Sequence, residues 1–145
     1  MIRKLGSIIG FGIAVLGILY LFEKGWIFSI NPITIIIQIC AIGLMIWARV
    51  TFGLRSFHLT ANASKGELVT TGPYRWLRHP IYASVIYFSI ASVISFPYLS
   101  AIAAVILISG GLFLRMIFEE KSLLLSYDNY KEYSKHTKRI IPFIF

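Results

Sequence analysis

The amino-acid sequence predicts an all-α, polytopic integral membrane protein. We expect about four transmembrane helices, the last two forming a short hairpin, followed by a cytoplasmic C-terminal helix. Of the 145 residues, 57% are hydrophobic and 14% charged, against about 45–50% and about 25% in soluble domains. The mean hydropathy is +0.77, and three runs carry no charge, at residues 5–22, 26–48 and 81–114. These observations exclude an ordinary soluble protein, and the length predicts one domain over residues 1–145.

The first two uncharged runs predict the two N-terminal helices, within residues 1–48. Residues 5–22 would form a helix of about 27 Å, which is long enough to cross a bilayer. Arg3 and Lys4 precede it as in a signal peptide, but no small-residue cleavage site follows, so we expect a retained helix. In the second run, Asn31 is suited to cap a helix and Pro32 to occupy its first position.

The third run predicts the helical hairpin, over residues 81–114. It is too long for one span, and Pro97 lies near its middle. A proline inside a helix removes a backbone donor and clashes with the preceding turn. We therefore expect two short helices joined by a tight turn.

Charge placement predicts the orientation. The sequence has 14 Lys and Arg against 6 Asp and Glu, a formal charge of +8. With both termini inside, Lys24 is the only basic residue in the outer turns, and cytoplasmic segments are expected to be basic. The 49–80 segment, the 115–145 segment and the active site would then be cytoplasmic.

The same charges bear on partners. Basic residues beside a membrane attract anionic headgroups, so we expect contact with membrane lipids, no nucleic acid and no obligate protein partner. Cys40 is the only cysteine and lies in an apolar run. It excludes an intramolecular disulfide and a cysteine-rich metal site, and no metal is expected.

Polar residues form two blocks, of which the first precedes the third apolar run. Its Gly72-Pro73 and His79-Pro80 steps force turns or extended backbone. Irregular backbone beside a membrane needs protein or water partners, which favours a site. Alternatively, Arg75 and Arg78 anchor headgroups and His79 only caps a helix.

The second block begins inside the last apolar helix. Arg115 and Glu119 are four residues apart and share a helix face. They form either a simple ion pair or a functional pair at the end of a transmembrane helix. Beyond them, Leu123, Tyr127 and Tyr130 follow at amphipathic helical spacing. Pro142 would close that helix, and the apolar residues after it can dock against the membrane or the core.

Together these motifs resemble the isoprenylcysteine carboxyl methyltransferase family and its phospholipid methyltransferase relatives. The matching strings are residues 68–75, 78–82, 115–120 and 139–142, with Tyr130 and Tyr133 between the last two. Their joint order, spacing and membrane context carry the resemblance, which covers about residue 48 to the C-terminus. The first two helices match only as generic apolar helices.

The resemblance implies a membrane methyltransferase that uses S-adenosylmethionine without a Rossmann domain, and the sequence has no Gly-x-Gly-x-x-Gly after a predicted strand. By position, Arg115 would face the substrate and Glu119 would bind the polar end of the cofactor. The remaining cofactor-binding residues would be Gly66, Glu67, Leu68, Val69 and Tyr74 on one side, and His79, Pro80, Ile81 and Tyr82 on the other. The acceptor would be lipidic or prenylated, with carboxylate O-methylation favoured.

Three alternatives remain open at this point. One is a phospholipid N-methyltransferase, another an NADPH-dependent enzyme related to the sterol reductases, and the third a non-catalytic membrane protein that binds a lipid or partner. Ser84 stands where many family members have glycine, and Ser126-Tyr127 where Phe-Gly is usual. These departures bear on substrate shape more than on cofactor binding.

Overall fold

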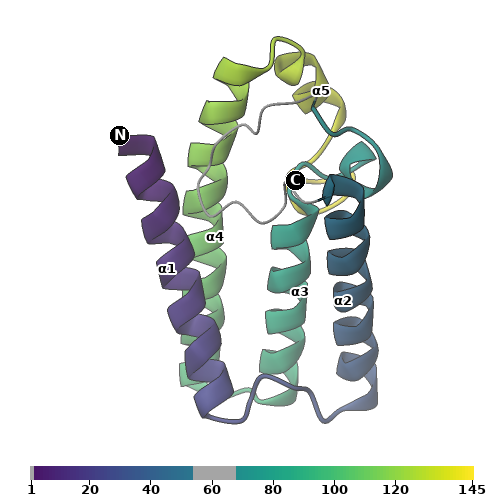
Figure 1. The fold of residues 1–145 in the computed structure, drawn as a ribbon. Coiled ribbons are helices and arrows are strands. Elements are labelled where there is room, and N and C mark those ends of the chain that lie inside the picture. Colours follow the sequence, from purple (N-terminus) through teal and green to yellow (C-terminus); the bar gives the residue numbers. More distant parts are fainter. Residues whose placement is uncertain (1, 54–67) are drawn as a thin grey trace.

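The part of the chain that the structure describes contains four long helices and two short helical segments (Figure 1). This computed structural model describes residues 2–53 and 68–145, apart from the side chains of residues 2 and 3. The long helices are α1 (Ile2–Glu23), α2 (Pro32–Phe52), α3 (Pro80–Ser95) and α4 (Leu99–Ser126); the short ones are the 3-10 turn η2 (Gly72–Arg75) and α5 (Tyr130–His136). The predicted all-α class is confirmed.

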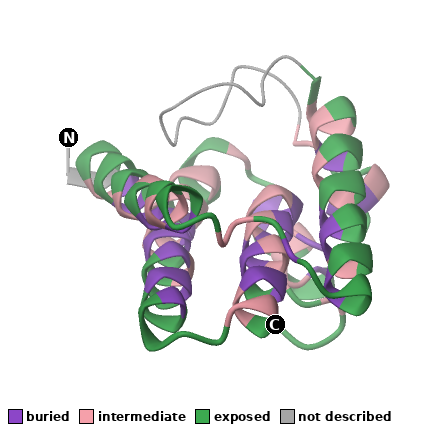
Figure 2. Cartoon of the chain, turned by 90° about the horizontal axis from the view of Figure 1, so that it is seen from below, coloured by how far each residue is buried: buried purple, intermediate pink, exposed green. Residues whose placement is uncertain are grey.

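Three of these helices are long and apolar enough to cross a membrane: Lys4–Glu23, Pro32–Phe52 and Leu99–Ser126. The fourth apolar helix, α3, has 16 residues. Buried residues gather on the sides where the helices meet, whereas the outward sides are mostly exposed (Figure 2). Those outward sides carry large apolar residues such as Val50 and Leu99, as expected of a multi-pass protein surrounded by lipid.

Local sequence signals place several helix ends correctly. Asn31 accepts a hydrogen bond from the Ile33 N–H at 2.9 Å, and Pro32 occupies the first position of α2. Pro97 separates α3 from α4, as predicted. However, α4 continues well past the expected boundary at residue 114, to Ser126.

The predicted amphipathic helix after α4 is interrupted. Tyr127 adopts an extended backbone, with φ −133° and ψ 114°, and Asp128-Asn129 forms a turn before α5. Asp and Asn favour turns because their side chains compete for backbone hydrogen bonds. α5 then ends at His136, ahead of Pro142. This break allows the chain to fold back over the bundle.

Glycines set the contact between α1 and α4. A Cβ atom on Gly10 would lie 2.5 Å from the Gly111 carbonyl oxygen, and one on Gly111 would lie 2.5 Å from the Gly10 carbonyl oxygen. Gly17 makes a similar approach to the Ala104 carbonyl. In a membrane, small residues allow such close backbone contact, and dispersion then holds the helices together.

Polar side chains join α2 to α3 at the end of the bundle that holds the α1–α2 connection. The Gln38 amide nitrogen donates to the Ile27 carbonyl at 2.9 Å and to the Ser92 hydroxyl at 3.1 Å. The Thr34 and Ser95 hydroxyls are 2.7 Å apart. Hydrogen bonds across helices stabilise membrane bundles, so this network fixes the α2–α3 pair at this end of the bundle.

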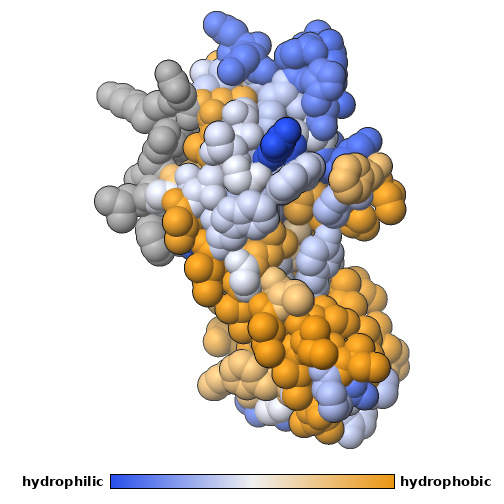
Figure 3. Space-filling view, turned by 90° about the vertical axis from the view of Figure 1, so that its right-hand side faces the viewer, coloured by the Kyte–Doolittle hydropathy of each residue, from blue (hydrophilic) through white to orange (hydrophobic). Residues whose placement is uncertain are grey.

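Apart from Glu23 and Lys24 at the end of α1, the described charged residues gather at the opposite end. There the first residues of α1 and α3 and the last residues of α2 and α4 lie together with α5 (Figure 1). A side view shows a mostly hydrophilic upper end above an apolar body (Figure 3). Both polar blocks of the sequence therefore meet at one end of the bundle.

Candidate functional site at the charged end of the bundle

Arg115, Tyr82 and Glu119 form the centre of the site. The Arg115 Nε donates to the Tyr82 hydroxyl oxygen at 2.7 Å and to Glu119 Oε1 at 3.0 Å. Tyr82 donates its own hydroxyl proton to the same Glu119 oxygen at 2.6 Å. Arg115 and Glu119 share a face of α4, as their spacing predicts, and Tyr82 reaches them from the first turn of α3.

The surroundings of this cluster are nearly dry. Arg115 is 6% exposed, and its guanidinium carbon lies 5.0 Å from the centre of the Phe11 ring on α1 and 5.9 Å from that of Tyr82. Cations are attracted to aromatic faces, more strongly where water is excluded. The charge of Arg115 is therefore held in place by three helices.

His79 lies beside this cluster, immediately before α3. Its imidazole is parallel to the Tyr82 ring, with 5.4 Å between centroids and 6° between planes. Nδ1 is 3.9 Å from Glu119 Oε2, and Nε2 is 3.4 Å from Glu120 Oε1. His79 is 6% exposed, and Nε2 is buried without a hydrogen-bond partner among the described residues. Its side chain makes no helix-capping bond, so capping does not explain this residue.

Glu120 is a central residue that the sequence analysis did not single out. Its carboxylate accepts from Arg78 Nε at 2.9 Å and from Arg139 Nη2 at 2.9 Å, and its side chain is 13% exposed. Because Glu119 and Glu120 are consecutive on a helix, they point in different directions. The available signal was this Glu-Glu pair, together with arginines in both polar blocks.

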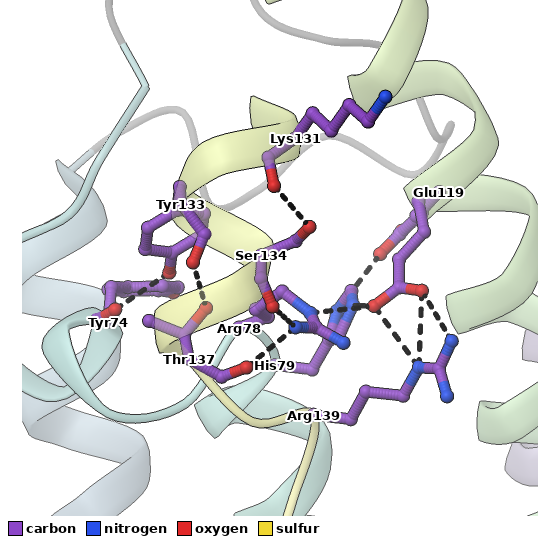
Figure 4. Close-up of polar contacts among 10 residues, drawn as sticks. Tyr74, Arg78, His79, Glu119, Lys131, Tyr133, Ser134, Thr137 and Arg139 are labelled. Carbon is purple, nitrogen blue, oxygen red and sulfur yellow. Dashed lines mark hydrogen bonds and ion pairs between the residues drawn. The ribbon is translucent and has the colours of Figure 1, made fainter. Parts of the chain in front are cut away.

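Arg78 ties Glu120 to α5. Its Nη1 donates to the carbonyl oxygens of Ser134 and Thr137, at 2.6 and 2.7 Å. Basic side chains commonly satisfy the last carbonyls of a helix in this way. Figure 4 shows Arg78 pointing toward these carbonyls, with Arg139 on the other side of the network.

The C-terminal segment runs alongside the residues before α3. Leu77 and Lys138 form an isolated parallel bridge. The Arg78 N–H donates to the Lys138 carbonyl at 2.6 Å, and the His79 N–H donates to the Arg139 carbonyl at 3.0 Å. Backbone pairing, in addition to the Glu120 ion pairs, therefore holds residues 138–139 against His79.

Tyr74 and Tyr133 form a neighbouring wall. The Tyr133 hydroxyl donates to the Tyr74 carbonyl at 2.7 Å, and the Tyr74 ring packs against Phe52 at 5.5 Å. Burial raises the pKa of the Tyr74 phenol above its ordinary value, and burial also raises the pKa of Tyr133 to about 12. Both phenols remain neutral donors at physiological pH.

The structure brings several predicted site residues together and leaves others at the margin. His79 and Arg115 each lie close to both Tyr82 and Glu119. Around them, Tyr74 and Pro80 are buried, whereas Leu68, Val69 and Ile81 are half-buried. Gly66 and Glu67 lie outside the described residues.

The fold and the site define a multi-pass membrane protein with a buried arginine, carboxylate and histidine cluster at one end of the helical bundle. Residues 33–125 match the model of the isoprenylcysteine carboxyl methyltransferase (ICMT) family. The chain belongs to this family, which confirms the resemblance seen in the motifs.

Two curated relatives support the assignment. The chain is 35% identical over 112 residues to a protein-S-isoprenylcysteine O-methyltransferase of Tribolium castaneum, over 73% of this chain and 40% of the relative. It is 33% identical over 101 residues to the Xenopus laevis protein of the same name, over 67% of this chain and 35% of the relative. The chain thus matches two fifths or less of the length of these relatives. No solved structure matches it.

Proposed function

We propose that this chain is an S-adenosylmethionine-dependent methyltransferase of the membrane, with a lipidic or prenylated acceptor. The single observation that carries the proposal is the buried Arg115–Tyr82–Glu119 cluster, in a chain of the isoprenylcysteine carboxyl methyltransferase family. Intramembrane ionisable groups are costly, and they are retained where they serve function.

The chemistry of the site fits the proposed cofactor. S-adenosylmethionine is a zwitterion with a sulfonium centre and supplies an electrophilic methyl group. Glu119 would offer a carboxylate to the ammonium group at its polar end, and the Tyr82 ring would offer an aromatic face to the sulfonium. His79 Nε2 is a buried polar atom without a hydrogen-bond partner among the described residues, and would be available to the polar end of the cofactor. Tyr74 and Pro80 would form the walls beside it.

An apolar cavity of about 230 Å³ supports a lipidic acceptor. It is lined by residues of α1, α2, α3 and the α1–α2 connection, including Ile18, Met45, Ser84 and Phe88. Ser84 donates its hydroxyl proton to the Ile81 carbonyl at 2.7 Å, so it presents little polarity to the cavity. An alkyl or prenyl chain would occupy this space, whose first lining residue on α3 is Ser84, two residues beyond Tyr82.

Arg115 favours a carboxylate acceptor. A guanidinium binds a carboxylate through directed hydrogen bonds, and an ionised carboxylate needs no general base. Arg115 would orient this carboxylate toward the electrophilic methyl group that the cofactor would supply. Alignment in a dry site can supply most of the acceleration. An amine acceptor must first lose a proton, and its ammonium form would be repelled by Arg115, which disfavours phospholipid N-methylation.

We also propose that the charged end faces the cytoplasm. Arg49, Arg75, Arg78 and Arg139 all belong to this end, and basic segments remain on the cytoplasmic side of membranes. This orientation can be tested by introducing single cysteines into a Cys40→Ser background and labelling intact cells with a maleimide that does not cross membranes. Phe28→Cys, in the α1–α2 connection, should label from outside, and Lys131→Cys, on α5, should not; the reverse pattern would overturn the orientation.

The decisive test of the activity is binding followed by transfer. Purified protein should bind S-adenosylhomocysteine and not NADPH, which separates the methyltransferase from a sterol reductase-like enzyme and from a non-catalytic protein. Methyl-labelled S-adenosylmethionine is then supplied with farnesylcysteine or with phosphatidylethanolamine. A methyl ester releases labelled methanol in base, whereas a methylated amine does not. Base-labile label on farnesylcysteine, absent with Glu119→Ala, is the expected result; no binding and no transfer would refute the proposal.

A further inference from the structure

The residues after Arg139 form a closed apolar turn, here called the 140–145 turn. The Ile140 and Ile141 N–H groups donate to a main-chain oxygen of Phe145 at 2.8 and 2.7 Å. The Ile144 and Phe145 N–H groups donate back to the Ile141 carbonyl at 3.2 and 3.1 Å. Pro142 has no N–H group. The turn therefore satisfies these backbone donors internally, as lipid requires of any segment that enters it.

Two side chains of this turn, those of Phe143 and Ile144, are largely exposed. Phe143 is 82% exposed and Ile144 is 75% exposed. Phe143 has φ 66°, a left-handed conformation that is unusual for a residue with a side chain. An exposed aromatic side chain at such a position is unfavourable in water, so we expect an apolar environment outside the chain to surround it.

Contacts with α3 and α4 place the turn at the level of the membrane-spanning helices. The Tyr87 hydroxyl, from the middle of α3, donates to the Ile140 carbonyl. The Phe145 ring stacks on Phe113 of α4, with centroids 6.2 Å apart. Figure 1 shows the C-terminus beside the first turn of α3 and the last turn of α2. The turn thus continues the apolar surface of the bundle.

The charged side chains of the C-terminal segment end just before the turn. Lys138 and Arg139 precede it, whereas residues 140–145 carry no charged side chain. Basic residues followed by exposed aliphatic and aromatic ones are typical of segments that lie in the interface, with charges at the headgroups and apolar side chains at the acyl boundary.

We propose that the 140–145 turn inserts into the lipid bilayer and anchors the C-terminal segment to the membrane. The turn would lie at the acyl boundary of the leaflet at the charged end of the bundle. We infer this location because the turn is continuous with the lipid-facing surface of α3 and α4. Since residues 138–139 pair with Arg78 and His79, the anchor fixes the segment that covers the candidate site. The inference rests on the membrane fold and does not depend on the proposed activity.

Spin labels on a Cys40→Ser background in lipid nanodiscs of phosphatidylcholine and phosphatidylglycerol test the insertion. Labels are attached to Phe143→Cys and Ile144→Cys. Ile106→Cys, on the exposed side of α4, is the lipid control, and Lys131→Cys, on α5, is the water control. Ile144→Cys avoids the left-handed position, so it remains informative if Phe143→Cys disturbs the turn. Circular dichroism and gel filtration confirm that each variant is folded.

Oxygen and a water-soluble nickel chelate then report the environment of each label. We expect residues 143 and 144 to collide with oxygen and to be shielded from nickel, as residue 106 is, with an oxygen-to-nickel ratio severalfold above that of residue 131. Nickel access equal to that at residue 131 would show a turn in water. Exclusion of both reagents would show a turn covered by protein. Either result overturns the proposal.

Discussion

The Tyr82 hydroxyl donates to Glu119 Oε1 at 2.6 Å, and this bond joins the first turn of α3 to α4 across 37 residues of sequence. The same hydroxyl oxygen accepts from Arg115. One phenol therefore contacts both the cation and the carboxylate of the site, while its ring stacks on His79.

Glu119→Gln should weaken S-adenosylhomocysteine binding by roughly tenfold to a hundredfold, because hydrogen bonds that involve a charged group contribute about 1.5–3 kcal/mol. Calorimetry on purified protein measures it. Glu132→Gln, on the exposed surface of α5 with a 64% exposed side chain, is the matched control. Wild-type affinity in Glu119→Gln would mean that this carboxylate does not bind the cofactor.

Arg115→Ala separates a substrate role from a structural one. If Arg115 orients the acceptor, turnover should fall far more than S-adenosylhomocysteine affinity, and Arg115→Lys should restore only part of the turnover because the planar guanidinium is lost. If it only positions Glu119, turnover and affinity should fall together, and Arg115→Ala/Glu119→Ala should be no worse than either single variant. Dissociation constants and turnover rates of Arg115→Ala, Arg115→Lys, Glu119→Ala and the double variant distinguish the substrate role from the structural role.

Glu120→Gln should loosen the C-terminal segment, because Arg78 and Arg139 share this carboxylate. We expect a loss of about 1–3 kcal/mol in unfolding free energy, well below the cost of a fully buried pair because the Arg139 side chain is 33% exposed. Trypsin should also cleave faster at Arg139. The double variant Glu120→Gln/Arg139→Gln should lose less unfolding free energy than the sum of the losses in the two single variants. Losses that add fully would argue against direct coupling between these residues.

Gly10→Ala should destabilise the bundle by about 1–3 kcal/mol, since the added Cβ would meet the Gly111 carbonyl at 2.5 Å and the Arg115 amide nitrogen at 2.9 Å. Gly12→Ala is the matched control, because a Cβ there meets nothing within 4 Å. It should be neutral or slightly stabilising, since alanine favours helices more than glycine. Thermal unfolding in detergent compares them, and equal melting temperatures would contradict the close α1–α4 contact.

Tyr133 should make stability depend on alkaline pH. Its pKa is raised to about 12 by burial, against about 10 in the unfolded chain. Its contribution is fully present below pH 10 and is lost as pH rises toward 12, because the unfolded state then releases the proton more readily. The difference in unfolding free energy between wild type and Tyr133→Phe should therefore shrink between pH 10 and 12. A constant difference would show that the phenol is not held neutral.

Local patterns in the sequence determined the helices and half of the site. Uncharged runs predicted the apolar helices, Asn31-Pro32 predicted the start of α2, and Pro97 predicted the break before α4. The four-residue spacing of Arg115 and Glu119 predicted their shared face. Each of these depends on residues within a few positions of one another, so the helical repeat and backbone sterics suffice.

Only the tertiary structure decided the contacts between distant segments. Local patterns could not select Glu120 as the residue that pairs with Arg78 and Arg139, since those partners lie 42 and 19 residues away in the chain. Likewise, neither the Gly10–Gly111 approach nor the placement of residues 138–139 against His79 follows from local periodicity. These contacts depend on how whole helices pack and on where Tyr127 interrupts α4, because packing geometry, rather than neighbouring residues, selects which side chains meet.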